Sequence, residues 1–201
     1  MAGTLYIVSA PSGAGKTSLV KALIQLQQGI EVSISFTTRA PRATEVDGRD
    51  YHFVSVAEFE RMAAKGDFLE TAKIYENWYG TSKQSIQKQL ETSDVVLEID
   101  WQGARQVSSA FNHNVVSIFV LPPSLEILAQ RLRGRGQDAE DVIQRRLGVA
   151  KEEIEHAAEY QFIIVNDDFE KASQDLAAIV RTFRLHRVHQ TSFLERLLIE
   201  G

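Results

Sequence analysis

The stretch from Ser9 to Ser18, SAPSGAGKTS, constrains the fold of this chain more than any other. It follows the apolar run Leu5 to Val8 and opens an amphipathic pattern from Lys16 to Gln28, so a buried strand, a tight loop and a helix are expected in that order. Gly13 and Gly15 let backbone N–H groups turn inward around an anion, and the helix N-terminus adds a favourable partial charge. The stretch therefore predicts a phosphate-binding loop.

The same loop supplies the side chains that a nucleoside triphosphate needs. Lys16 is expected to reach the β- and γ-phosphates, and the Thr17 hydroxyl is expected to ligate Mg²⁺. The pattern GxxxxGK[ST] asks for glycine where this chain has Ala10, so the match departs at one position. The alternative is a chance glycine-rich turn, against which the flanking strand and helix patterns argue. The predicted nucleotide-binding residues are Ser12, Gly13, Ala14, Gly15, Lys16, Thr17 and Ser18.

Composition narrows the kinds of site that this chain can form. Its 201 residues fit one large domain or a core with insertions, and a net charge of −5 gives no argument for nucleic acid or membrane as a partner. The absence of cysteine excludes disulfides, thiolate metal sites and thiol catalysis. The five histidines show no ligand spacing, so oxygen atoms are expected to hold any metal. Residues 1–4 carry neither a basic nor a long apolar leader, which predicts a cytoplasmic protein.

Short apolar runs alternate with helical patterns along the chain, which predicts an α/β fold with a parallel sheet buried on both faces. Besides the helix after the loop, helices are expected from Ser124 to Leu132 and from Ala172 to Leu198, the latter packing against the sheet. The expected strands are Leu5 to Val8, Val32 to Ser35, Val95 to Ile99, Val115 to Leu121 and Phe162 to Val165.

Two segments break this alternation and are interpreted as excursions from the core. Residues 36–82 contain possible strands at Tyr51–Val54 and Phe68–Glu70 around a helix at Val56–Lys65, which favours a small α+β insertion. Residues 131–150 place arginines around glycines and a helix, as a closing lid over a phosphoryl group requires. The predicted division is a core of residues 1–34, 83–130 and 156–201, an insertion of residues 35–82 and a lid of residues 131–155.

The run TTRAPR places Arg39 and Arg42 three residues apart in an irregular segment. Two guanidinium groups at this spacing suit one phosphate, bound through forked, charge-assisted hydrogen bonds. Tyr51, Tyr79 and Thr81 could add hydroxyl donors to the same anion. The alternative is a solvated basic loop with aromatic side chains in a small core.

Six stretches in chain order together resemble guanylate kinase: APSGAGKT at 10–17, SFTTRAPR at 35–42, DGRDYHF at 47–53, WYGT at 78–81, EIDWQGA at 98–104 and VNDD at 165–168. The similarity extends from Leu5 to about Leu185. It implies transfer of the ATP γ-phosphoryl group to GMP or dGMP with Mg²⁺, in purine nucleotide metabolism. It also implies a P-loop NTPase-type parallel sheet flanked by helices, an inserted GMP-binding domain and a helical lid.

The resemblance also assigns roles to side chains. Glu70, Thr81 and Asp100 would recognise guanine, since a carboxylate can accept from the N1–H and 2-amino groups that adenine lacks. The implied GMP-binding residues are Ser35, Arg39, Arg42, Tyr51, Glu70, Tyr79, Thr81 and Asp100. Arg135 and Asn166, an adenine contact, join the loop in binding ATP. The implied catalytic residues are Lys16, Arg135 and Arg146, with Arg131 as a further candidate, whereas Arg133 and Arg145 are expected to be solvated.

Glu98 and Asp100 lie two residues apart at the end of an apolar run, so both are expected to point from one strand face into the ligand crevice. A carboxylate here could support Mg²⁺ through water, contact the base or do both. The alternative is that the pair caps the following helix.

Two rival functions remain open at this stage. One is a non-catalytic interaction scaffold, against which the intact phosphate loop and the lid arginines argue. The other is a kinase acting on AMP, dTMP or a sugar phosphate, against which Glu70 and the TTRAPR run argue. The expected partners are ATP and GMP or dGMP, without nucleic acid or membrane. The C-terminal helix could mediate homo-oligomer formation or simply pack on the core.

Overall fold

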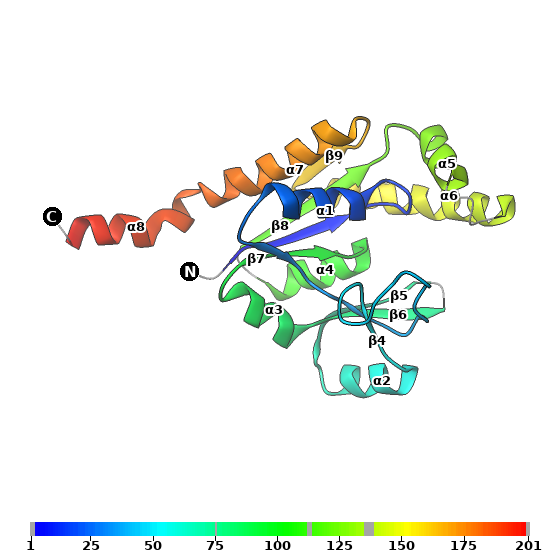
Figure 1. The fold of residues 1–201 in the computed structure, drawn as a ribbon, viewed down its shortest axis with the longest axis horizontal. Coiled ribbons are helices and arrows are strands. Elements are labelled where there is room, and N and C mark those ends of the chain that lie inside the picture. Colours follow the sequence, from blue (N-terminus) through cyan, green and yellow to red (C-terminus); the bar gives the residue numbers. More distant parts are fainter. Residues whose placement is uncertain (1–2, 75, 112–113, 135–138, 200–201) are drawn as a thin grey trace.

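Two β-sheets organise the chain, and the larger one has the N-terminal strand at its centre (Figure 1). The computed structural model describes residues 3–74, 76–111, 114–134 and 139–199. In these ranges the larger sheet is parallel throughout, as predicted for an α/β fold. Its strand order is β2 (Ile30–Val32), β7 (Asp94–Glu98), β1 (Leu5–Ser9), β8 (Val115–Leu121) and β9 (Phe162–Val165).

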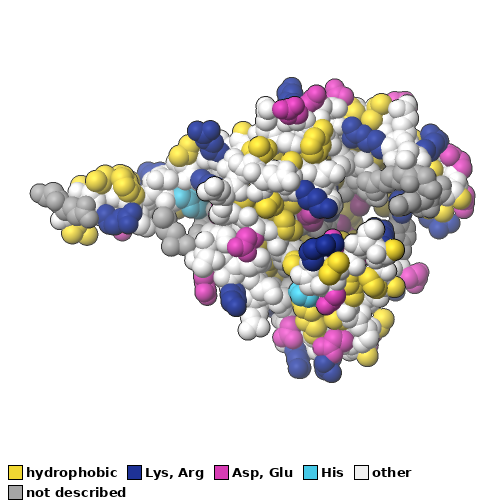
Figure 2. Space-filling view, viewed as in Figure 1, with side chains coloured by type: hydrophobic (Ala, Val, Ile, Leu, Met, Phe, Trp, Pro, Cys, Tyr) yellow, Lys and Arg dark blue, Asp and Glu magenta, His cyan; other side chains and the backbone are white. Residues whose placement is uncertain are grey.

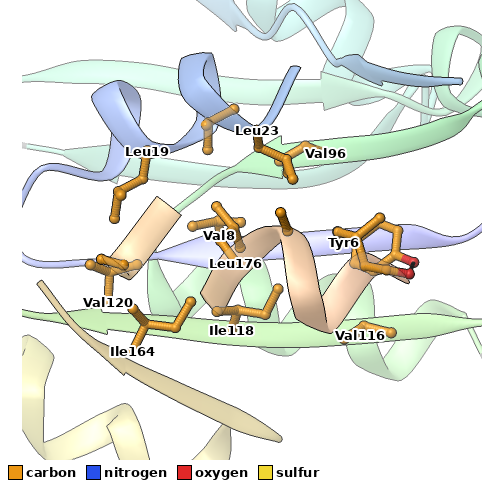
Figure 3. Packing of buried hydrophobic residues seen from close by; sticks show 14 of the residues in the cluster. Tyr6, Val8, Leu19, Leu23, Val96, Val116, Ile118, Val120, Ile164 and Leu176 are labelled. Atoms are coloured by element: carbon orange, nitrogen blue, oxygen red, sulfur yellow. Dashed lines mark hydrogen bonds between the residues drawn. The ribbon is translucent and has the colours of Figure 1, made fainter. Parts of the chain in front are cut away.

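One face of the larger sheet is covered by α1 (Lys16–Leu26) and α7 (Phe169–Arg184). Tyr6 and Val8 of the central strand point to this face, where they pack in a buried cluster with side chains of both helices, including Leu176 (Figure 3). Because successive strand residues alternate in direction, the residues between them must serve the other face.

The opposite face is covered by α3 (Lys83–Leu90) and α4 (Trp101–Ala110). Leu5 and Ile7 of β1 belong to its buried cluster, together with side chains of both helices such as Val107. A sheet covered on both faces needs apolar side chains in both directions. This explains why the strands appear in the sequence as continuous apolar runs.

The smaller sheet lies beside the core and carries its own helix, α2 (Val56–Ala64), which the Ser55 side chain caps by accepting from the Glu58 N–H at 3.1 Å. Phe59 of α2 stacks on Phe68 with ring centroids 4.5 Å apart, giving this sheet a separate aromatic core. The predicted α+β insertion therefore forms, with two strands that the sequence did not reveal, β3 (Phe36–Thr37) and β6 (Asn77–Ser82). Its edge-to-edge order is β4 (His52–Phe53), β3, β6 and β5 (Phe68–Ile74).

The arginine-rich segment forms two helices, α5 (Leu125–Gly134) and α6 (Glu140–Glu155). Leu128 and Leu132 of the first pack against Ile143 of the second in a small cluster of their own. A short 3-10 helix, η1 (His156–Glu159), then leads into β9. The two helices thus meet the core at one side of the sheet, at the right of Figure 1.

The expected single helix from Ala172 to Leu198 is wrong. Helix α7 ends in a tightened turn in which the Leu185 N–H bonds to the carbonyls of the last helical turn, and the Gln190 side chain binds the Arg184 carbonyl at 2.9 Å. The following α8 (Arg187–Ile199) has no buried residue and projects away from the sheets (Figure 1). Its apolar residues are not gathered on one side, so packing against the sheet holds for α7 alone.

Two further boundaries differ from the sequence prediction. The first helix ends at Leu26 rather than Gln28, because Gln27 is extended and Gly29 has φ 70°. The strand expected at Val32 to Ser35 lies earlier, at β2, and the chain then crosses to the smaller sheet. No helix in the described ranges is long and apolar enough to cross a membrane.

Candidate active site

The predicted phosphate loop joins the end of β1 to the start of α1. Gly13 and Gly15 have φ angles of 97° and 99°, which side chains rarely tolerate, and the Ala14 N–H donates to the Pro11 carbonyl at 3.0 Å. Gly15 is also the residue that precedes the first turn of α1, so the unpaired N–H groups of that turn face the loop. This geometry is suited to an anion.

The two polar side chains that follow the loop contact the end of β7. Strand β7 pairs with β1 in register, Val8 opposite Glu98, which brings that carboxylate beside α1. The Thr17 hydroxyl donates to Glu98 Oε2 at 2.8 Å, and Lys16 Nζ donates to the Ile99 carbonyl at 3.5 Å. A hydroxyl and a carboxylate thus lie together beside an ammonium group.

These oxygen atoms suit Mg²⁺, which prefers hard oxygen ligands and usually keeps several waters. Within the described part of the chain, no group of three or more His, Asp or Glu side chains could hold a metal by itself. The Thr17 and Glu98 pair therefore matches an ion that a bound phosphate would share, not a closed protein site.

A cleft of about 950 Å³ brings the loop together with the smaller sheet and α6. Figure 2 shows the molecule hollowed between these parts, with Lys and Arg side chains near the opening. Of the predicted residues, Ala14 and Thr81 lie fully buried behind the lining, Asn166 is also buried, and Arg135 lies outside the described residues. The cleft is lined by the remaining predicted residues: Ser12, Gly13, Gly15, Lys16, Thr17, Ser18, Ser35, Arg39, Arg42, Tyr51, Glu70, Tyr79, Asp100 and Arg146.

Arg39 is held in place by a carboxylate that the sequence analysis missed. Its Nη2 donates to both oxygens of Glu45, at 2.8 and 2.9 Å, and the Arg42 backbone N–H donates to Glu45 Oε2 at 2.8 Å. The hydrogen bonds from Arg39 hold the pKa of the Glu45 carboxyl below its usual range. An acidic residue just after the TTRAPR run was the available signal. Glu45 orients one guanidinium before any anion arrives.

Aromatic rings complete this basic part of the cleft. The guanidinium carbon of Arg39 lies 5.6 Å from the centre of the Tyr51 ring, within the range of a cation–π contact. The Tyr51 and Tyr79 rings meet edge to face at 6.0 Å, and burial raises the pKa of Tyr51. The Tyr51 phenol therefore stays protonated at neutral pH and can donate to an anion.

Glu70 is the most deeply buried acid of the cleft, with 3% of its surface exposed. The Thr81 hydroxyl donates to Glu70 Oε1 at 2.6 Å, and the Ser35 and Thr81 hydroxyl oxygens lie 3.4 Å apart. Burial raises the pKa of Glu70 to about 7, with Asp100 adding to the rise and the Thr81 hydrogen bond opposing it. The second carboxylate oxygen, Oε2, lies towards Gly103, and the Glu70 side chain lines the cleft.

Asp100 does not lie on the strand as expected, because β7 ends at Glu98. Its Oδ1 accepts from the Gly103 N–H at 2.9 Å and caps α4, so the capping alternative is confirmed for Asp100, while Glu98 contacts Thr17 instead. Gly103 has no room for a side chain, since a Cβ there would lie 2.7 Å from Glu70 Oε2. The start of α4 therefore closes the pocket around the buried carboxylate.

Helix α6 presents Arg146 and three acidic side chains to the cleft, Glu152, Glu153 and Glu155. Arg146 and Glu153 are seven residues apart, which places them on one helix face, and both line the cleft. Burial raises the pKa of Glu153 to about 7, while Lys16 and the Ser12 backbone N–H lower it. The sequence analysis missed Glu153, although its spacing from Arg146 was a usable signal. Arg133 pairs with Glu140 at the surface, as expected for a solvated arginine.

Asn166 lies behind the phosphate loop instead of in the cleft lining. It is 4% exposed, and its Nδ2 donates to the Ala14 carbonyl at 2.7 Å. Arg131, the further candidate of the sequence analysis, donates from Nη2 to the Asn166 carbonyl at 2.9 Å. Asn166 therefore contacts the loop directly, and Arg131 contacts Asn166.

Comparison with known proteins gives one consistent result. The family model described as guanylate kinase matches residues 2–183. The guanylate kinase of Thiobacillus denitrificans is 56% identical over 94% of this chain and 90% of its own length. The guanylate kinase of Nitrosococcus oceani is also 56% identical, over 100% of this chain and 98% of its own length.

Solved structures agree at the level of the fold. The crystal structure of guanylate kinase from Anaplasma phagocytophilum matches with a TM-score of 0.74 and 33% identity, covering 92% of this chain and 88% of the other. A shikimate kinase from Bacteroides thetaiotaomicron matches with a TM-score of 0.50 and 15% identity, covering 89% and 98%. The second likeness concerns the fold alone.

Proposed function

Because this chain belongs to the guanylate kinase family and is therefore an ATP:GMP phosphotransferase, we propose that its cleft binds MgATP at the phosphate loop and GMP or dGMP against the smaller sheet. One observation carries this assignment: a single cleft joins the loop to two arginines and a buried carboxylate. The loop and the arginines are groups that bind phosphates, and the carboxylate is the hydrogen-bond acceptor that guanine requires.

The proposed acceptor site divides its work between charge and hydrogen bonding. Arg39, oriented by Glu45, and Arg42 bind the GMP phosphate together with the phenols that face them. Glu70 accepts from the guanine N1–H and 2-amino groups. An adenine ring would leave this buried carboxylate without donors, and an unpaired buried acceptor is the main source of discrimination against the wrong base.

The proposed donor site acts by positioning. Lys16 binds the β- and γ-phosphates, and Arg146 reaches the transferring group from α6. Thr17 would hold Mg²⁺ directly, with Glu98 supporting it through water. When bound, the ion neutralises charge on the β- and γ-phosphates.

In the proposed reaction a GMP phosphate oxygen attacks the γ-phosphorus as the bond to the ADP oxygen breaks. No side chain has to act as nucleophile, so the enzyme contributes alignment and charge stabilisation. We further propose that residues 131–155 form a lid, because α5 and α6 carry arginines and pack mainly on each other. Function in purine nucleotide metabolism and a cytoplasmic location stay predictions from the sequence.

The test is a panel of acceptors assayed with ATP in a coupled spectrophotometric measurement. GMP and dGMP should be phosphorylated, IMP should be poorer because it lacks the 2-amino group, and AMP and dTMP should give no more than background. Omission of Mg²⁺ with added chelator should abolish turnover. A preference for AMP would overturn the role of Glu70, and inactivity with every acceptor would favour an interaction scaffold.

A further inference from the structure

We propose that Asn166 is a positioning residue for the phosphate loop, through its Nδ2 contact with Ala14, and that Arg131 anchors it there from helix α5. This rests on the proposed function only in that the loop is taken as the site of the ATP phosphates. It differs from the role of Asn166 as an adenine contact, which the family resemblance implied.

The first support is the orientation of the side-chain amide. Its partner, the Ala14 carbonyl at 2.7 Å, can only accept a hydrogen bond, so the end of the amide that faces it must be Nδ2. Oδ1 is buried and has no hydrogen-bond partner among the described residues. The polar contact of this side chain is thus made to the loop backbone.

The second support is that both backbone groups of Asn166 are also engaged. Its N–H donates to the Leu121 carbonyl at 2.8 Å, at the end of the neighbouring strand β8. Its carbonyl accepts from Arg131 Nη2 at 2.9 Å. Asn166 is thus bonded to the sheet, to α5 and to the loop. Because the sheet and α5 hold Asn166 in place, its side chain holds the loop in a fixed position relative to them.

The third support is the fit between the amide and the loop. A Cβ added to Gly15 would lie 2.4 Å from Asn166 Nδ2, so the bare glycine leaves the space that the amide fills. Gly15 has a positive φ angle and immediately precedes Lys16. A hydrogen bond to the residue before Gly15 therefore restrains the part of the loop that directs its N–H groups and Lys16 towards phosphate.

The inference predicts that the donor end of the amide matters for phosphate binding, whichever base the nucleotide carries. Asn166→Leu keeps the approximate shape of the side chain and adds no charge, but replaces the N–H donor that faces the Ala14 carbonyl by a methyl group. Asn166→Ala removes both ends. We expect both variants to bind inorganic tripolyphosphate about tenfold more weakly than the unsubstituted protein, because each loses one buried hydrogen bond that holds the loop in place.

The experiment measures tripolyphosphate binding by calorimetry and turnover with ATP and ITP, which lacks the 6-amino group of adenine. The expected result is weaker tripolyphosphate binding, an equal loss of kcat/KM for ATP and ITP, and unchanged GMP affinity. A loss confined to ATP, with tripolyphosphate binding intact, would restore the adenine contact and overturn the inference. Equal loss of GMP affinity, with a lowered Tm, would show a general folding defect and also overturn it.

The uncharged Asn166→Leu variant, which is similar in shape, decides the question if the alanine variant does not fold. Turnover of the unsubstituted protein tests the proposed function separately, because a lack of turnover with GMP in that protein would contradict the function itself. Turnover that is normal in both variants would contradict only the role of Asn166.

Discussion

The two halves of the cleft are built in opposite ways. The donor half is a contiguous stretch between β1 and α1, and its shape is fixed by local backbone geometry at Gly13 and Gly15. The acceptor half draws Ser35, Glu70 and Thr81 from three different segments and adds the start of α4 behind them. A contiguous site can be recognised from a short motif, whereas a dispersed one becomes visible only when its strands pair.

The halves also differ in how they hold charge before a ligand binds. On the donor side, Lys16 and Thr17 make single contacts to the end of β7 that a phosphate could replace. On the acceptor side, Arg39 is fixed by both oxygens of Glu45, and Glu70 is buried with a raised pKa. The acceptor half is therefore more strongly preorganised, whereas each half holds an acid with a pKa raised to about 7, Glu70 on the acceptor side and Glu153 near Lys16 and Ser12 on the donor side.

The largest effect is expected from removing the donor ammonium group. Lys16→Ala should lower kcat by about 10³-fold, since charge on the transferring group loses its nearest cation, while the Kd for GMP changes less than about twofold. Lys21→Ala, on an exposed position of the same helix, is the matched control and should behave as the unsubstituted protein. Steady-state kinetics and calorimetry measure the two quantities. A loss of GMP affinity comparable to the loss of kcat would mean that Lys16 also acts on GMP binding and that the two halves of the cleft do not bind their ligands independently.

The next largest effect is expected from neutralising the buried acceptor. Glu70→Gln should raise KM for GMP by about 10- to 100-fold, because an amide presents one oxygen and an N–H where guanine offers donors. KM for ATP should stay within about twofold. The exposed Glu60→Gln on α2 is the control. An unchanged KM for GMP would remove Glu70 from base recognition.

A smaller effect is expected from the pH dependence of GMP binding through Glu70. With the pKa of Glu70 raised to about 7, its ionised form is lost as pH falls, so GMP affinity should drop about tenfold between pH 8 and pH 6. Binding at pH 6.5 should release a proton, which calorimetry in buffers of different ionisation enthalpy measures. The phosphate of GMP titrates near pH 6 as well, so the difference between the unsubstituted protein and Glu70→Gln is the diagnostic quantity. Equal pH profiles would contradict the assignment.

The same group gives a stability signature of fixed sign. The folded state holds the Glu70 proton more tightly than the unfolded chain, in which the pKa of this carboxyl is near 4.5, the ordinary value for glutamate. Its contribution to the free energy of unfolding is therefore complete below about pH 4.5 and declines as pH rises towards 7. Thermal unfolding of the unsubstituted protein and of Glu70→Gln should be compared between pH 4.5 and pH 7. The free energy of unfolding of the unsubstituted protein should fall relative to that of Glu70→Gln as the pH rises.

The sequence anticipated the phosphate loop, the parallel sheet and the small insertion because each depends on local pattern. It missed Glu45 and Glu153, whose roles arise from which side chains they meet. It also joined α7 and α8 into one helix, because both segments have helical composition, although the apolar residues of α8 do not lie on one side and none is buried. Errors of this kind fall where helix-forming composition continues but packing does not.

By itself, the sequence determined the phosphate loop, because glycines with positive φ angles, Lys16 and Thr17 lie within five residues and need only a strand and a helix beside them. The tertiary structure alone decided the surroundings that give the acceptor site its chemistry. Burial under α4 and the Thr81 hydroxyl set the protonation of Glu70, and the register of β1 with β7 brought Glu98 to Thr17. Burial and pairing depend on residues distant in the chain, so no local pattern encodes them.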